Sequence, residues 1–282
     1  IPTFEAVGWI VRGPELIKTS LDRMMAGQFV ARDTKMPLLT VKALGFNVEA
    51  KDAHYRWQGD PSTGLGTWAF SIASIGLPEE LMSGLTGPFS PQALGYGAVV
   101  MSMNGTSSLG LVENLAETDT DVTISLSQMG ALTIAFKVGN IPPSLFDALQ
   151  AAQKAPESID VNALMGQAQT ITIGGLRIRY DDASLVTRLL DQLVKTEGKT
   201  REALIAEAVQ TGEFALLGFN TPEFTAQAKA ATQAFLENPG WIQLEAAPDT
   251  PVSVTQFMQL LGSPADALKL LKVSVTSGPP EE

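Results

Sequence analysis

The stretch VTISLSQMGALTIAFKV, residues 122–138, decides the fold class of this chain. Apolar side chains alternate with threonine and serine over 122–126, and alternate again with alanine, threonine and lysine over 132–138. Successive side chains of a strand point to opposite faces, so this period of two predicts a pair of antiparallel strands. One face of such a pair is apolar and buried, whereas the other face is polar.

Weaker forms of the same pattern lie on both sides of this stretch. Residues 54–57 and 68–72 alternate around the turn-forming segment 59–64, which predicts a second hairpin. Residues 171–178 alternate around Gly174-Gly175, a pair that indicates a tight turn or a β-bulge.

Leucine-rich helices are expected directly after several of these strands, each begun by a few Pro, Asp, Ser or Thr residues. The predicted helices cover residues 16–25, 78–85, 143–149, 184–193, most of 200–237, and two segments that begin near Ser253 and Pro264. The order of strand followed by helix recurs without a fixed period, which argues against a solenoid. The predicted fold class is therefore α+β: a curved, mainly antiparallel β-sheet with repeated strand-to-helix units that pack helices on one side.

One continuous organisation is expected rather than two unrelated domains. Residues 1–117 form an N-terminal β-rich part, and residues 118–276 form a strand/helix part that continues the same sheet. Residues 277–282, with the sequence SGPPEE, are expected to form a flexible tail.

Composition excludes several classes of function. The chain has 282 residues, with 19 Lys and Arg against 30 Asp and Glu, giving a net charge of −11. A field of this sign repels phosphates and anionic lipid headgroups, so nucleic-acid binding and electrostatic docking to a membrane are not expected. There are no cysteines, which excludes disulfides, thiolate nucleophiles and cysteine-based metal sites. No run approaches the roughly 20 apolar residues of a transmembrane helix.

The single histidine, His54, gives little support for catalysis. One histidine rules out metal centres that use a pair or triad of histidines, and it removes most His-based catalytic pairs. His54 falls on the polar side of an alternating strand beside Arg56, so we interpret it as a surface residue.

Two acidic pairs are interpreted structurally. Asp119-Thr120-Asp121 has the first spacing of a calcium loop but lacks the later Gly and Glu, so a turn that enters a strand is favoured. Asp181-Asp182 could be a carboxylate pair for acid–base catalysis, but both residues stand between a strand and a helix, where helix capping accounts for them. We therefore expect a protein that is not an enzyme, with no catalytic residue, no cofactor and no metal site.

The four tryptophans allow two interpretations. Trp57 and Trp68 are expected to share one face of the second hairpin, either in a filled core or in an apolar ligand groove. Both arrangements require the same alternation, so no individual ligand-binding residue is assigned.

The second half of the chain resembles a known group of proteins. The resemblance rests on SQMGAL (127–132), IRYDDASL (178–185), KTRE (199–202), FLENPG (235–240) and PV (251–252), in this order. From about Thr118 onward the chain resembles uncharacterised proteobacterial envelope proteins that are distantly similar to AsmA-type periplasmic proteins. The resemblance implies an exported, β-rich protein linked to envelope or lipid homeostasis, with no catalytic residues to carry over.

The leading hypothesis is a non-catalytic bacterial cell-envelope protein that binds a lipid or another apolar ligand on a sheet/helix groove. The alternative is a structural or assembly subunit that acts through protein–protein contacts in an oligomer or larger complex. A third hypothesis is a hydrolase whose fold brings two carboxylates together. The chain begins with Ile1, which removal of a signal peptide would explain, as would a trimmed or disordered start. We expect a periplasmic location.

Overall fold

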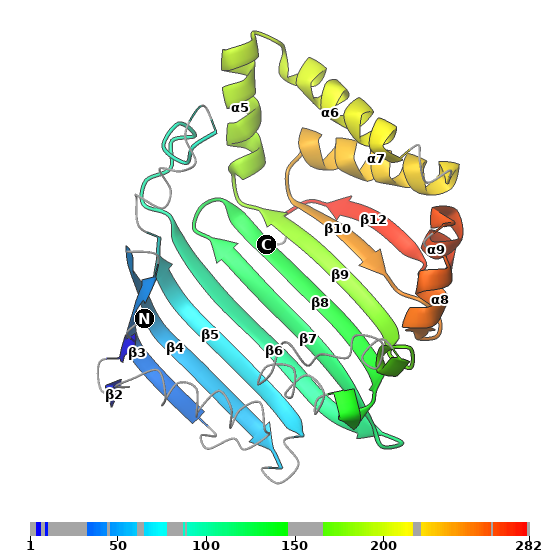
Figure 1. Cartoon of the computed structure of the whole chain (residues 1–282). Helices are drawn as coiled ribbons and strands as arrows, with labels where there is room; N and C mark the ends of the chain where they lie inside the picture. Colours follow the sequence, from blue (N-terminus) through cyan, green and yellow to red (C-terminus); the bar gives the residue numbers. More distant parts are fainter. Residues whose placement is uncertain are drawn as a thin grey trace.

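The computed structural model describes residues 4–6, 9–10, 33–43, 46–60, 65–77, 87, 89–145, 166–216, 221–260 and 262–280. Within these residues, one antiparallel sheet runs through the whole protein in the order β12-β10-β9-β8-β7-β6-β5-β4-β3-β1-β2, with β11 paired to β9 (Figure 1). Its strands are β1 (Phe4–Ala6), β2 (Trp9–Ile10), β3 (Asp33–Ala43), β4 (Phe46–Gly59), β5 (Gly66–Gly76), β6 (Val100–Val112), β7 (Leu115–Leu126), β8 (Gly130–Ile141), β9 (Thr172–Asp182), β10 (Trp241–Ala246), β11 (Val252–Ser253) and β12 (Val273–Gly278).

The longer helices gather at the C-terminal end of this curved sheet, which is not closed (Figure 1). They are α5 (Leu185–Glu197), α6 (Arg201–Leu216), α7 (Pro222–Glu237), α8 (Val254–Gln259) and α9 (Pro264–Leu270). The predicted α+β class, with a curved antiparallel sheet and helices packed on it, is confirmed.

The hairpin predicted from residues 122–138 is formed by β7 and β8. Val122 lies opposite Ile134 and Ile124 lies opposite Leu132, so the apolar side chains of both strands share one face. Gln128 adopts a positive φ of 64°, which closes the turn. The alternation therefore predicted this part of the sheet correctly, because register and side-chain face are linked by the period of two.

The glycine pair at 174–175 forms a bulge and not a turn. Lys137 pairs with Gly175 whereas the next residue, Val138, pairs with Ile173, so one residue of β9 has no partner on β8. The strand continues through the bulge, and apolar residues on either side of it stay on the same face.

The second predicted hairpin is formed by β4 and β5, and Trp57 lies directly opposite Trp68. Trp57 is almost completely buried, with 1% of its surface exposed. Asp52 has a positive φ of 52°, and both Ala50 and Ala53 are buried although they are three residues apart. The irregularity at Asp52 therefore shifts the alternation by one residue and keeps both alanines on the apolar face.

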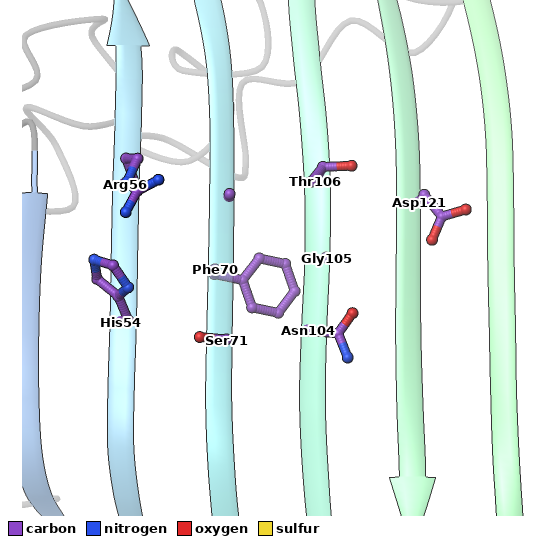
Figure 2. A pocket seen from close by; sticks show the side chains of 9 residues that line it. His54, Arg56, Phe70, Ser71, Asn104, Gly105, Thr106 and Asp121 are labelled. Atoms are coloured by element: carbon purple, nitrogen blue, oxygen red, sulfur yellow. The ribbon is translucent and has the colours of Figure 1, made fainter.

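Strand β6 and the first half of β7 were not predicted from the sequence. Asn104-Gly105 reads as a turn signal, yet both residues lie in the middle of β6. Gly105 pairs with Phe70, and a Cβ on Gly105 would lie 2.8 Å from the Phe70 ring. Figure 2 shows this ring directed toward the glycine. The aromatic side chain of β5 thus covers the position that a β6 side chain would occupy.

The interpretation of residues 119–121 as a turn before a strand is wrong. Asp119 and Asp121 lie within β7, opposite Lys137 and Ala135 of β8. Hydrogen bonds between Thr120 and Ser107 hydroxyls at 2.7 Å satisfy polar groups on the other face of this strand pair. Threonine is a good strand former, and these cross-strand bonds replace the apolar signal that sequence patterning needs.

Helix α7 packs against β12 and β10, and two of its side chains make specific contacts with the sheet. The rings of Phe235 and Tyr180 meet edge to face with their centroids 6.1 Å apart. The Gln227 side chain accepts a hydrogen bond from the backbone N–H of Val275 at 3.4 Å. Because β12 is the last strand of the sheet, this contact satisfies a polar group that an edge strand leaves unpaired.

Only one of the two neighbouring aspartates caps a helix. The Asp182 carboxylate accepts hydrogen bonds from the Val186 N–H at 3.0 Å and from the Tyr180 hydroxyl at 2.9 Å. Asp181 points to the opposite face, where it forms an ion pair with Arg179 at 2.7 Å. Capping therefore accounts for Asp182 alone, since adjacent strand residues point to opposite faces.

Two helices begin with a capping hydroxyl, as the Ser and Thr residues at predicted helix starts suggest. The Thr200 hydroxyl accepts a hydrogen bond from the Ala203 N–H, and Ser253 forms a full capping box with Gln256. At the C-terminus, β12 continues through Gly278, two residues into the segment predicted as a tail.

Three predicted helices lie wholly or partly outside the residues that the structure describes. Residues 16–25 and 78–85 lie outside them, and the helix predicted at 143–149 is described only over 143–145, which are helical.

Candidate functional site

The two faces of the sheet differ sharply in chemistry. The register places Phe136, Ile134 and Leu132 of β8 opposite Leu176, Ile178 and Tyr180 of β9, all on one face. We call this the apolar face; on the neighbouring strands it also carries Trp57, Trp68, Phe70, Ile72, Met101, Met103, Val122, Ile124, Leu126, Leu244 and Val275.

The apolar face is exposed in its central part. Leu132, Phe136 and Ile178 have 37%, 38% and 37% of their surfaces exposed. Ile178 lies opposite Ile134, which is the residue between Leu132 and Phe136 on the same face, so these side chains are neighbours. We call these three residues the exposed patch. Large apolar side chains that gather in the open are typical of surfaces that bind a ligand or a partner.

The dimensions of this surface suit an extended apolar molecule. Apolar residues occupy alternate positions of β8 from Leu132 to Val138. Three steps of two residues correspond to about 20 Å along the strand. One acyl chain crosses about half of the roughly 30 Å hydrocarbon core of a bilayer. The face is therefore long enough for a chain of that size.

A cluster of hydroxyls divides the apolar face. Ser107 and Thr120 lie between Trp68 on one side and Phe136 on the other. Thr118 completes the cluster, with its hydroxyl 3.5 Å from that of Ser107. Since the hydroxyls bond to one another, they place polar atoms on this face without leaving them unpaired.

The opposite, polar face carries a shallow pocket of about 250 Å³ on β4, β5, β6 and β7 (Figure 2). His54 Nε2 lies 2.7 Å from the Asp33 carboxylate, and Arg56 lies 3.7 Å from the same carboxylate. The hydrogen bond with His54 lowers the pKa of Asp33, and the positive charges nearby add to this effect. The structure thus places His54 on the polar face, as predicted.

The pocket brings a serine near this histidine. Ser71 lies directly opposite His54, and its hydroxyl points toward the histidine ring (Figure 2). No hydrogen bond joins the two side chains within the described part of the chain. Activation of a nucleophile requires the serine and its base within hydrogen-bond reach. The pocket therefore has the residue types of a nucleophilic site without its defining contact.

Asp121, from the first of the two acidic pairs, is engaged by a basic residue. Asp121 forms an ion pair with Arg177 at 2.9 Å on the polar face. Over the residues that the structure describes, no group of three or more His, Asp and Glu side chains could hold a metal ion. Asp121 therefore joins β7 to β9 across β8 and does not contribute to a metal site among the described residues.

Tyr180 links the apolar face to the helices. Its hydroxyl donates to the Asp182 carboxylate at 2.9 Å and lies 3.1 Å from the Met129 carbonyl. Burial raises the pKa of Tyr180 strongly, and the Asp182 carboxylate raises it further. The tyrosine therefore remains a neutral donor and fixes the start of α5 beside the apolar face.

Comparison with known proteins assigns a family to the part of the chain that contains the exposed patch. The model of a bacterial protein family described as an uncharacterized protein matches residues 123–278. The chain belongs to this family. The matched residues include the exposed patch and helices α5 to α9, whereas most of the polar pocket lies before them.

The family match confirms the predicted likeness to uncharacterised bacterial proteins in the second half of the chain. It carries no link to AsmA-type proteins, so that part of the resemblance stays a prediction. A comparison with curated proteins finds no match. Within the described residues, no helix combines the length and the apolar character that crossing a membrane requires.

Sequence reasoning identified the strands β7 and β8 of the apolar face but not its exposed patch. The alternation at 122–138 marks Leu132 and Phe136 as inward-facing residues, as it does Ile124. No signal in the sequence distinguishes a covered strand face from an open one.

Proposed function

We propose that this protein is a non-catalytic binding protein of the bacterial cell envelope, which holds a lipid against the apolar face of its sheet. The exposed patch of Leu132, Phe136 and Ile178 carries the proposal. Exposed apolar surface of this kind is costly in water, and a bound acyl chain removes that cost by burying it.

The length of the face supports a chain-like ligand rather than a compact one. The apolar run of about 20 Å on β8 accepts an extended acyl chain along the strand direction. Its neighbours on β7 and β9 add apolar side chains on both sides, so the chain would be contacted by three strands. A lipid is therefore the ligand class that this surface fits best.

The proposal is tested by lipid extraction from protein purified without detergent, followed by mass spectrometry, and by titration with a fluorescent fatty acid. Phe136→Ser should reduce binding about three- to sevenfold, because full burial of a phenylalanine side chain contributes roughly 1.5–3 kcal/mol and the ligand covers only the 38% of Phe136 that is exposed. Ala135→Ser is the matched control, since Ala135 is the adjacent residue on the polar face. The proposal fails if no lipid is extracted and the wild type does not bind the probe.

A second candidate is a structural or assembly subunit. Leu111 and Val112, at the tip of the β6–β7 hairpin, are 48% and 55% exposed. Apolar residues at such a projecting tip favour contact with another protein. Size-exclusion chromatography with light scattering separates the two functions: a defined oligomer that carries no lipid supports assembly, and a monomer with bound lipid supports the first proposal.

The periplasm is the proposed compartment. The absence of cysteine from the sequence is compatible with export, and the acidic charge disfavours nucleic-acid partners. Fractionation of the host cells, with detection of the native protein, tests this location directly.

A further inference from the structure

A groove of about 670 Å³ lies between the start of α7, helix α9 and the start of β12. Figure 1 shows α7 and α9 on two sides of this strand. Ligand sites commonly have volumes of roughly 300–1,000 Å³, so the groove is of a size that holds a small molecule.

The groove has apolar walls. Phe224 of α7, Leu268 of α9 and Val273 of β12 line it, and all three are half-buried. Mostly apolar walls with a few polar groups are typical of sites for small organic ligands. This composition suits a hydrocarbon better than a sugar or a nucleotide.

The groove joins the apolar face by a continuous row of side chains. Val273 pairs with Ala246, Ala246 with Leu176, and Leu176 with Phe136 of the exposed patch. Three strand spacings give about 14 Å from Val273 to Phe136. The groove therefore lies beside the surface to which lipid binding is assigned, three strands away across the sheet.

Two lysines stand at the groove. Lys272 forms an ion pair with Asp249 at 2.5 Å, whereas Lys269 has no ion-pair partner among the described residues. One positive charge thus remains without a carboxylate in a chain whose net charge is −11. Glu223, also at the groove, is exposed and carries the opposite charge.

The groove also contains a hydroxyl that lacks a hydrogen bond. Thr221 precedes α7 and lines the groove, and its side-chain oxygen is buried with no hydrogen-bond partner in the described part of the chain. Buried polar groups are nearly always paired. A ligand oxygen that accepts from this hydroxyl would satisfy it.

We propose that the groove binds the carboxylate end of a fatty acid, a conclusion that rests on the proposed lipid-binding function and names its ligand. The single negative charge of the carboxylate matches Lys269, the groove lysine for which the described residues supply no ion-pair partner. One carboxylate oxygen accepts from Lys269 and the other from the Thr221 hydroxyl. The hydrocarbon chain contacts Phe224, Leu268 and Val273.

Isothermal titration at pH 7 with dodecanoate tests the assignment, with 1-dodecanol and dodecyl phosphate as comparison ligands. Dodecanoate should bind more tightly than the alcohol, which lacks the charge. Dodecyl phosphate should bind no more tightly than dodecanoate, since Lys272 is engaged by Asp249. Tighter binding of the phosphate, or equal binding of the alcohol, overturns the assignment to a carboxylate.

Charge variants give effects of opposite sign. Lys269→Gln should weaken dodecanoate binding about fivefold, the value of one charge pair near water. Glu223→Gln should strengthen it, because it removes a like charge from the groove. Lys195→Gln is the control, since Lys195 is an exposed lysine at the far end of α5. Equal affinity of both groove variants and the wild type contradicts the proposal.

The failure of this inference differs from the failure of the proposed function. If lipid binding is sensitive to Phe136→Ser but not to Lys269→Gln or Glu223→Gln, the apolar face binds lipid and the groove is not its headgroup site. If the wild type binds none of the three ligands and yields no lipid on extraction, both the proposed lipid binding and the carboxylate site in the groove are wrong.

Discussion

The two halves of the apolar face have the same sequence pattern, but their most buried and most exposed aromatic residues, Trp57 and Phe136, differ sharply. On β4, Trp57 is 1% exposed, and Ala50 and Ala53 beside it are also buried. On β8, Phe136 occupies the same cross-strand row as Trp57 and is 38% exposed. Alternation determines which face a side chain points to, but what lies above that face determines whether the side chain is buried.

The difference in exposure distinguishes apolar residues that stabilise the fold from apolar residues that are available to bind a ligand. The covered half contributes to stability, because its side chains are removed from water in the folded protein. The open half gains the same benefit only when a ligand covers it. Stability and binding should therefore respond to substitution in different halves of one continuous surface.

The largest effect is expected from truncation in the covered half. Trp57→Ala should lower the free energy of unfolding by about 3–5 kcal/mol, as large-to-small changes of buried aromatic residues do. Phe136→Ala should lower it by only about 1 kcal/mol, because much of this ring is already in water. Urea unfolding followed by circular dichroism measures both. A similar loss for the two variants would indicate that the open half is covered in solution.

A smaller effect is expected in β6, which lies between the halves. A Cβ at Gly105 would lie 2.8 Å from the Asp121 carbonyl and from the Phe70 ring, so Gly105→Ala should cost about 1–3 kcal/mol. Gly110, in the same strand, has nothing within 4 Å of its Cβ position. Gly110→Ala should be neutral or stabilise the protein by up to about 1 kcal/mol, because alanine restricts the unfolded chain. Thermal unfolding compares the pair, and equal effects would mean that the Phe70 ring moves aside at little cost.

Strands were predicted correctly where the local sequence alternates clearly, and were missed where it does not. The hairpin of β7 and β8 was predicted because both strands alternate around a turn with Gly130. Strand β6 was missed because Asn104-Gly105 is a common turn signal, and only the distant Phe70 ring explains why glycine is accepted there. Contacts between strands override local preferences in such positions.

The candidate site was less predictable than the fold. The sequence supplied the side chains of the apolar face but not their exposure, which depends on where α7 and its neighbours lie. The groove at Thr221 and Lys269 joins residues about fifty positions apart, and neither residue belongs to a local motif. The hydroxyl of Thr221, which stands at the N-cap position of α7, forms no capping bond.

The smallest effect concerns the polar face beneath the covered half, where His54 of β4 holds Asp33 of β3. The pKa of Asp33 is lowered in the folded protein, so its contribution to stability is present above the unfolded value of about 3.9 and is lost as pH falls through the folded value. His54→Gln should raise the pKa of Asp33 toward its ordinary value, although Arg56 at 3.7 Å keeps part of the shift. NMR titration of the Asp33 carboxyl measures this change. Ser71→Ala is the control, because Ser71 lies on the other side of His54 and makes no bond to Asp33. An unchanged titration in His54→Gln would show that the His54 contact does not set the pKa of Asp33 in solution.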